Sequence, residues 1–109
     1  MYNFGLVVIK NLRTSKPRYG CNWQVRVDRS SVLGNPFYMH AESERDLVCD
    51  KYQLYFDKQL TCNSDFVAEL NRLLGIYKQY GKIELFCWCY PKRCHAETIK
   101  AWLLNNINL

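Results

Sequence analysis

The sequence has no hydrophobic stretch that approaches the roughly 20 apolar residues needed to cross a bilayer. Its first residues also lack the basic segment and apolar run of a secretory signal. These absences lead us to expect a cytoplasmic protein with no membrane partner. A weakly hydrophobic, charge-dominated composition is missing as well. Hydrophobic residues make up 49% of the chain, which excludes a disordered protein.

Internal repeats, low-complexity tracts and linker-like segments are also absent. A chain of 109 residues is close to the commonest size of a single hydrophobic core. We therefore predict a single α/β domain over residues 1–109.

Acidic residues are nearly missing from residues 1–29, where Asp28 is the one carboxylate. The same segment carries six cations, so it holds the whole net charge of +5. A focused positive charge favours phosphate-bearing partners. A solvated basic loop explains the charge equally well. The six cations are Lys10, Arg13, Lys16, Arg18, Arg26 and Arg29.

Three segments have the pattern of β-strands. The apolar run over residues 4–9 and the alternation over residues 23–27 predict two strands. Residues 83–89 are apolar on both faces, which predicts a central third strand.

Three helices are predicted between and after these strands. The first begins at a cap on Ser43 and runs to about Leu60. The second begins at Asn63 or Ser64 and ends before Gly81. The third follows Pro91. The interleaving predicts a small layered, Rossmann-like α/β domain with a short, partly parallel sheet of about three to four strands and about three helices.

Six cysteines divide into two groups. Cys21, Cys49 and Cys62 are scattered, and we interpret them as core packing residues. The other three gather in Cys87-Trp-Cys-Tyr-Pro-Lys-Arg-Cys-His95, where the predicted central strand turns into the last helix. Ligands of open α/β sheets bind at such carboxyl ends of strands.

This Cys–His segment allows three interpretations. The first is an anion pocket, because a helix N-terminus favours anions and Lys92 and Arg93 add charge there. The helix start would lower the pKa of the Cys94 thiol, and His95 could act as acid, base or phosphate donor. The second is a zinc site from Cys87, Cys89, Cys94 and His95, whose ligand spacing is poor for zinc. The third is structural, with the thiols packed in the core.

Two motifs resemble those of a family catalogued as a domain of unknown function (DUF4326), which occurs in bacteriophages and bacteria. They are Ser31-Val-Leu-Gly-Asn-Pro-Phe37 and Leu85-Phe-Cys-Trp-Cys-Tyr-Pro-Lys-Arg-Cys-His-Ala-Glu97, with Arg29 before the first and the pair Arg45 and Tyr52 between them. The resemblance implies that the Gly-Asn-Pro-Phe turn and the Cys–His turn meet in one pocket. Asp28 replaces the usual glycine, and a carboxylate there could pair with Arg29.

The resemblance implies a small phage-type accessory protein, which would act in the host cytoplasm if a phage encodes it. We expect this protein to bind a phosphorylated small molecule, such as a nucleotide, and to sequester or process it. Whether it is an enzyme stays open, because no Ser–His–Asp order or second carboxylate supports a named mechanism. Cys94 or His95 would be the reacting group. No cofactor is expected unless the zinc interpretation holds. The expected ligand-binding residues are Arg29, Ser31, Gly34, Asn35, Arg45, Cys89, Lys92 and Arg93.

Two other functions stay open. The basic residues 10–18 could hold the phosphates of a nucleic acid, with Tyr19 or Trp23 stacking on bases. Alternatively, the chain could bind a host protein as a counter-defence factor, with a structural Cys/His or zinc cluster. The sequence does not predict an oligomeric state.

Overall fold

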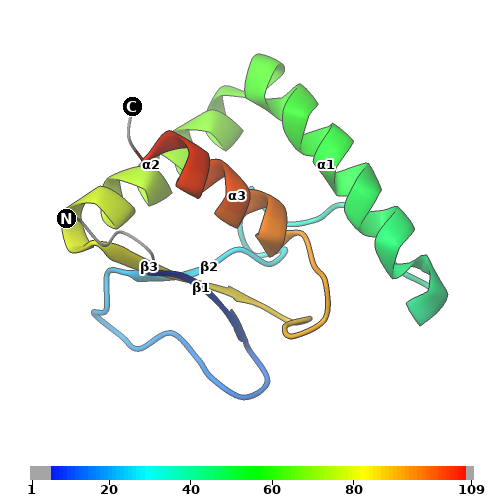
Figure 1. The fold of residues 1–109 in the computed structure, drawn as a ribbon, viewed down its shortest axis with the longest axis horizontal. Coiled ribbons are helices and arrows are strands. Elements are labelled where there is room, and N and C mark those ends of the chain that lie inside the picture. Colours follow the sequence, from blue (N-terminus) through cyan, green and yellow to red (C-terminus); the bar gives the residue numbers. More distant parts are fainter. Residues whose placement is uncertain (1–5, 108–109) are drawn as a thin grey trace.

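A three-stranded parallel sheet forms one layer of the protein (Figure 1). The structure is a computed structural model and describes residues 6–107. The strands are β1 (Leu6–Asn11), β2 (Gln24–Arg26) and β3 (Lys82–Cys87). Their order is β1-β3-β2, and β3 pairs in parallel with both neighbours. The strand predicted to be central is therefore central, and the carboxyl ends of all three strands meet at one edge.

Three helices lie on one face of this sheet (Figure 1). They are α1 (Arg45–Cys62), α2 (Ser64–Tyr80) and α3 (Ala96–Asn106), and a 3-10 turn, η1 (Glu42–Glu44), precedes α1. The loop between β1 and β2 extends on the opposite side of the sheet (Figure 1). The predicted α/β class is confirmed.

The core lies between the sheet and the helices. Ile83, Leu85 and Cys87 alternate along β3 and are almost completely buried there. The opposite face of β3 is polar at Glu84, which accepts a hydrogen bond from Gln24 at 2.8 Å and pairs with Lys10 at 3.5 Å. Burying an apolar strand face under helices is the main source of stability in such a layer.

Helix α2 has the ends that the sequence predicts. The side-chain oxygen of Asn63 accepts hydrogen bonds from the backbone N–H groups of Asp65 and Phe66, which the first helical turn leaves without partners. Gly81 follows the helix with a φ of 70°, a conformation that favours glycine.

Two predicted helix starts are wrong. Helix α1 begins after η1, and Ser43 does not cap it. Instead the Glu44 carboxylate accepts a hydrogen bond from the backbone N–H of His40 at 2.8 Å. The last helix begins at Ala96 rather than at Pro91, because the N–H of Lys92 bonds to the carbonyl of Cys89 at 2.9 Å and closes a turn.

Two further boundaries differ from the sequence prediction. The first strand extends to Asn11, and residues 4 and 5 of the predicted strand lie outside the described residues. Strand β3 ends at Cys87, so Trp88 and Cys89 belong to the loop that leads to α3. No described helix is long and apolar enough to span a membrane.

Candidate functional site

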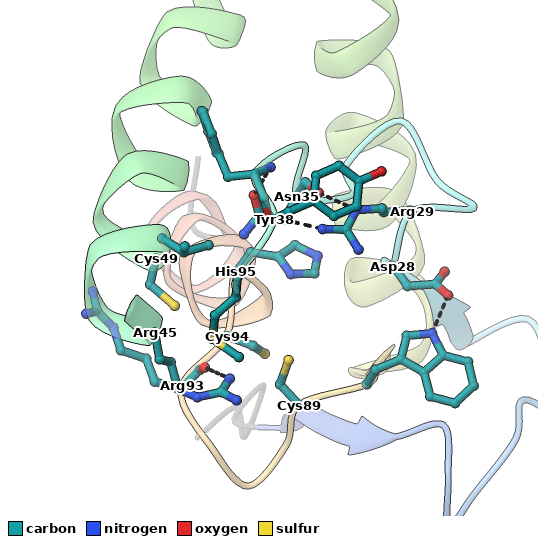
Figure 2. A pocket seen from close by; sticks show the side chains of 14 residues that line it. Asp28, Arg29, Asn35, Tyr38, Arg45, Cys49, Cys89, Arg93, Cys94 and His95 are labelled. Atoms are coloured by element: carbon teal, nitrogen blue, oxygen red, sulfur yellow. Dashed lines mark hydrogen bonds between the residues drawn. The ribbon is translucent and has the colours of Figure 1, made fainter. Parts of the chain in front are cut away.

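A cavity of about 310 Å³ lies where the chain leaves β2 and β3 and enters α3. Asn35 and Phe37 of the first motif line it, and so do Cys94 and His95 of the second. Helix α1 supplies the remaining wall. The structure thus brings the two motifs together at the carboxyl edge of the sheet, as the family resemblance implies. Figure 2 shows the side chains around this cavity.

The turn after β2 is shaped by a close backbone contact at Gly34. A β-carbon at this position would lie 2.6 Å from the Cα of Arg29 and 2.6 Å from the carbonyl oxygen of Asp28. Ser31 supports the same turn, because its hydroxyl accepts the N–H of Leu33 at 3.1 Å. Neither Gly34 nor Ser31 lines the cavity. Both positions shape the turn that carries Asn35.

Asn35 lines the cavity, but its side-chain carbonyl oxygen already has a hydrogen-bond partner. Its side-chain oxygen accepts the backbone N–H of Phe37 at 2.8 Å, as Asx turns do. The NH₂ group of Asn35 remains available as a donor.

Arg29 is held rigidly at the cavity wall. Its Nε donates to the carbonyl of Asn35 at 2.9 Å, and its Nη2 donates to the carbonyl of Phe37 at 3.0 Å. The guanidinium also stacks over the ring of Tyr38, 4.2 Å from the ring centre. Arg29 forms no ion pair within residues 6–107, and its Nη1 keeps N–H groups for a ligand.

The expectation that Asp28 pairs with Arg29 is wrong. Burial raises the pKa of Asp28, but hydrogen bonds from Arg26, Ser30 and Trp88 outweigh this effect and hold the pKa well below its usual value. The indole Nε1 of Trp88 donates to this carboxylate at 2.9 Å, and the Ser30 hydroxyl at 2.6 Å. Asp28 therefore interacts with other partners, and its carboxylate does not compensate the charge of Arg29.

Tyr52 of α1 contacts both motifs from within the core. Its fully buried hydroxyl donates to the carbonyl of Leu33 at 2.7 Å. Its ring meets the ring of His95 edge to face, with the centroids 5.0 Å apart. Tyr52 therefore fixes the turn after β2 and the start of α3 against each other.

His95 lies between Arg29, Asn35 and Tyr38 on one side of the view and Cys89 and Cys94 on the other (Figure 2). Its Nε2 lies 2.5 Å from the carbonyl oxygen of Val27. Burial, and then the nearby charge of Arg29, lower the pKa of His95, although the contact with Val27 opposes this shift. The ring is therefore neutral near pH 7, Nε2 carries the proton donated to Val27, and Nδ1 keeps a lone pair.

The thiols of Cys87 and Cys94 form a buried pair, with their sulfur atoms 3.2 Å apart. The hydrogen bond with Cys94, together with the backbone N–H groups of Cys89 and Tyr90, lowers the pKa of Cys87. The same hydrogen bond and burial raise the pKa of Cys94. The predicted lowering of the Cys94 pKa is therefore wrong. The effect of the Cys87 thiolate on the pKa of Cys94 is larger than the opposite effect of the α3 dipole.

The other expected cations of the site are neutralised by carboxylates. Arg45 makes a two-pronged ion pair with Glu42, at 2.9 and 2.7 Å, and Lys92 contacts the same carboxylate at 3.2 Å. Hydrogen bonds to Glu42 and then to the Cys89 thiol raise the pKa of Arg45. Lys92 does not line the cavity.

Arg93 is occupied in the same way. It pairs with Asp46 at 3.0 Å and with Asp50 at 2.9 Å, and its carbonyl accepts Nη1 of Arg45 at 2.9 Å. These contacts fasten the loop after β3 to α1. Arg45 and Arg93 border the cavity, but their charges are largely compensated.

Residues 6–107 contain no group of three or more His, Cys, Asp or Glu side chains that is arranged to hold a metal ion. The four residues of the zinc interpretation are not brought together as such a group. Cys87 is buried against Cys94, and Nε2 of His95 faces the carbonyl of Val27.

The sequence analysis missed several cavity residues, among them Trp88, Cys49 and Tyr38. Trp88 was assigned to a strand face, yet its indole anchors Asp28. Cys49 was assigned to core packing, and it is indeed buried, but it also borders the cavity. Tyr38 lies just beyond the first motif, where no spacing signal marks it. The unusual Asp28 was the one available hint of the Trp88 contact.

We predict that Gly34→Ala destabilises the protein by about 1–3 kcal/mol, because the new methyl group must displace the backbone of residues 28 and 29. The melting temperature should fall by roughly 4–8 °C for each kcal/mol. Gly75→Ala is the matched control, since a β-carbon there meets nothing within 4 Å and alanine favours the helical conformation of α2. Equal melting temperatures for the two variants would contradict the close contact at Gly34.

We also predict that protonation of His95 weakens the fold. Because the pKa of His95 is lower in the folded than in the unfolded chain, the unfolded state binds this proton more readily. The contribution of neutral His95 to the free energy of unfolding is fully present above about pH 6.5, the ordinary histidine pKa. Below that pH this contribution falls by up to about 1.4 kcal/mol per pH unit. Urea unfolding between about pH 7 and pH 5 measures this slope. His95→Gln keeps an N–H donor for Val27 but cannot titrate, so its slope should be clearly smaller; an unchanged slope would refute the assignment.

The family comparison agrees with this geometry. The family described as Domain of unknown function (DUF4326) matches residues 10–105, which include both motifs and every element that lines the cavity. Neither the curated proteins nor the solved structures gave a match to the chain. The match over most of its length shows that this chain belongs to the family Domain of unknown function (DUF4326).

Proposed function

We propose that the cavity binds a phosphorylated small molecule, such as a nucleotide or a nucleotide-derived compound. The observation that carries the proposal is the fixed guanidinium of Arg29, which has two backbone carbonyls and a tyrosine ring to hold it but no carboxylate among the described residues. A rigid guanidinium with free N–H groups matches the oxygen atoms of a phosphate.

The aromatic side chains around Arg29 support a ligand with a flat ring. Tyr38 and Trp88 border the cavity and remain 68% and 48% exposed. Arg29 covers one face of the Tyr38 ring, so Tyr38 can offer its other face to a ligand. Exposed aromatic faces stack on bases with little regard to base identity. A volume of about 310 Å³ is at the lower end of the range for small-molecule sites, which favours a mononucleotide over a larger cofactor.

The residue before α3 offers a polar group to the same ligand. His95 presents a neutral imidazole in the cavity wall. If the protein also processes its ligand, the Nδ1 lone pair of His95 can act as the base. We propose that the protein binds the nucleotide. In a phage or bacterial cytoplasm, a small accessory protein with this property would sequester or process the bound nucleotide.

Nucleic-acid binding has weaker support. Arg13, Lys16 and Arg18 are exposed on the loop between β1 and β2, with a fully exposed Tyr19 beside them. However, Trp23, the other stacking candidate, is covered by the ammonium group of Lys82 at 4.2 Å and packs against Tyr80. The basic loop also lies on the side of the sheet away from the helices (Figure 1).

A thermal-shift screen tests the proposal. Nucleoside mono-, di- and triphosphates should raise the melting temperature, whereas the unphosphorylated nucleosides should not. At a ligand concentration one hundred times Kd, the stabilisation should be about 2.7 kcal/mol. Arg29→Ala should weaken binding at least about tenfold, because a charge-assisted hydrogen bond contributes about 1.5–3 kcal/mol.

Arg13→Ala is the matched control, since it removes an equal charge from the exposed loop. It should leave the ligand-induced shift unchanged. Each shift is measured against the same variant without ligand, so that a loss of stability is not mistaken for a loss of binding. If no nucleotide stabilises the wild type more than Arg29→Ala, the proposal fails. A shift lost in Arg13→Ala but kept in Arg29→Ala would instead favour the nucleic-acid alternative.

A further inference from the structure

We propose that Cys87 and Cys94 are a reversible oxidation site, at which a peroxide converts the thiol pair into an internal disulfide. The inference does not depend on the identity of the ligand. It rests on the geometry of two sulfur atoms from different elements, one at the end of β3 and one just before α3.

The two sulfur atoms are already close to bonding distance. They lie 3.2 Å apart, and a disulfide bond is about 2.05 Å long, so they must approach by roughly 1 Å. Because Cys94 is in the loop that leads into α3 rather than within a helix, the loop after β3 can absorb this movement. Both side chains are buried in the core, which protects the pair from most large reagents.

The cavity gives a small oxidant access to this pair. Cys94 is 5% exposed and lines the cavity wall, whereas Cys87 lies behind it with 1% exposure. Cys89 lines the same wall and is half-buried. A peroxide that enters the cavity therefore reaches the pair from the Cys94 side, and it reacts with whichever sulfur is the thiolate, which is Cys87.

The reaction balances with hydrogen peroxide as the oxidant. The pair begins with one shared proton, as one thiol and one thiolate. The Cys87 thiolate attacks one peroxide oxygen, forming a sulfenic acid and releasing hydroxide. The Cys94 thiol then attacks the sulfur of the Cys87 sulfenic acid, the S–S bond forms and the thiol proton leaves with the hydroxyl group as water. Both sulfur atoms are oxidised, peroxide is reduced, and a thiol reductant reverses the change.

Oxidation would act on the loop that carries part of the cavity wall. Residues 88–93 lie between the two cysteines, and Trp88, Cys89 and Arg93 of this loop line the cavity. The side chain of Asn11 also holds the loop, donating to the carbonyl of Tyr90 at 2.6 Å. A new bond at the ends of the loop would restrict it while leaving this hydrogen bond in place.

Peptide mapping of the full chain after peroxide treatment tests the inference. The protein is exposed to a small excess of hydrogen peroxide, remaining thiols are alkylated, and trypsin releases Cys87 in residues 83–92 and Cys94 in residues 94–100. We expect a cross-link between these two peptides, lighter by two hydrogen atoms than their sum, which a dithiol reductant abolishes. Fragmentation of the cross-linked peptide assigns the bond to Cys87 or to Cys89.

Matched serine variants make the assignment independent of fragmentation. Cys89→Ser and Cys62→Ser should retain the cross-link, whereas Cys87→Ser should lose it. If Cys87→Ser fails to fold, the wild-type map and Cys89→Ser still decide the question. A cross-link through Cys89, over-oxidation of Cys94 without any cross-link, or stoichiometric zinc that is released when these thiols are alkylated would each overturn the proposal. None of these outcomes bears on nucleotide binding, so the two proposals fail separately.

Discussion

The contact between the His95 ring and the carbonyl of Val27 is the interaction on which the site depends. It joins the start of α3 to the end of β2, two segments separated by most of the chain. Burial keeps the ring neutral, so the contact is a hydrogen bond between uncharged groups and leaves the other ring nitrogen as an acceptor. Tyr52 reinforces the same junction through the carbonyl of Leu33 and the edge of the His95 ring. The cavity exists because these contacts hold two turns side by side.

The electrostatics of the site follow from which cations are already paired. Arg45, Lys92 and Arg93 are bound to carboxylates of η1 and α1, and they tie the loop after β3 in place. Asp28 forms its ion pair with Arg26 and accepts hydrogen bonds from Ser30 and Trp88, so its charge is not available to Arg29. Among the cavity residues within the described part of the chain, Arg29 is the cation that pairs with no carboxylate, and it lies beside the neutral His95. That arrangement favours an anionic group of the ligand next to Arg29, and it explains why local positive charge is a poor guide to this site.

Local patterns predicted the parts of the fold that depend on nearby residues. The β-branched and apolar runs identified the three strands, and Asn63 and Gly81 marked the ends of α2, because caps act through their own turn. The errors are of two kinds, local turns that no pattern marked and contacts with residues far away in the sequence. Pro91 did not begin a helix, since the chain first turns back at Cys89. The pKa of Cys94 is raised by Cys87, which the folded sheet places beside it. The motifs located the cavity, but no spacing could show how each arginine there is paired.

Nuclear magnetic resonance with a nucleoside diphosphate tests the central claim most directly. The side-chain N–H signals of Arg29, Asn35 and Trp88 report on the three donors at the cavity wall, and the amide of His95 reports on the start of α3. Our account predicts that these signals shift together as the ligand is added, and that the amides of residues 13–19 on the basic loop do not. Shifts confined to that loop, or no shifts at all with any phosphorylated nucleoside, would contradict it.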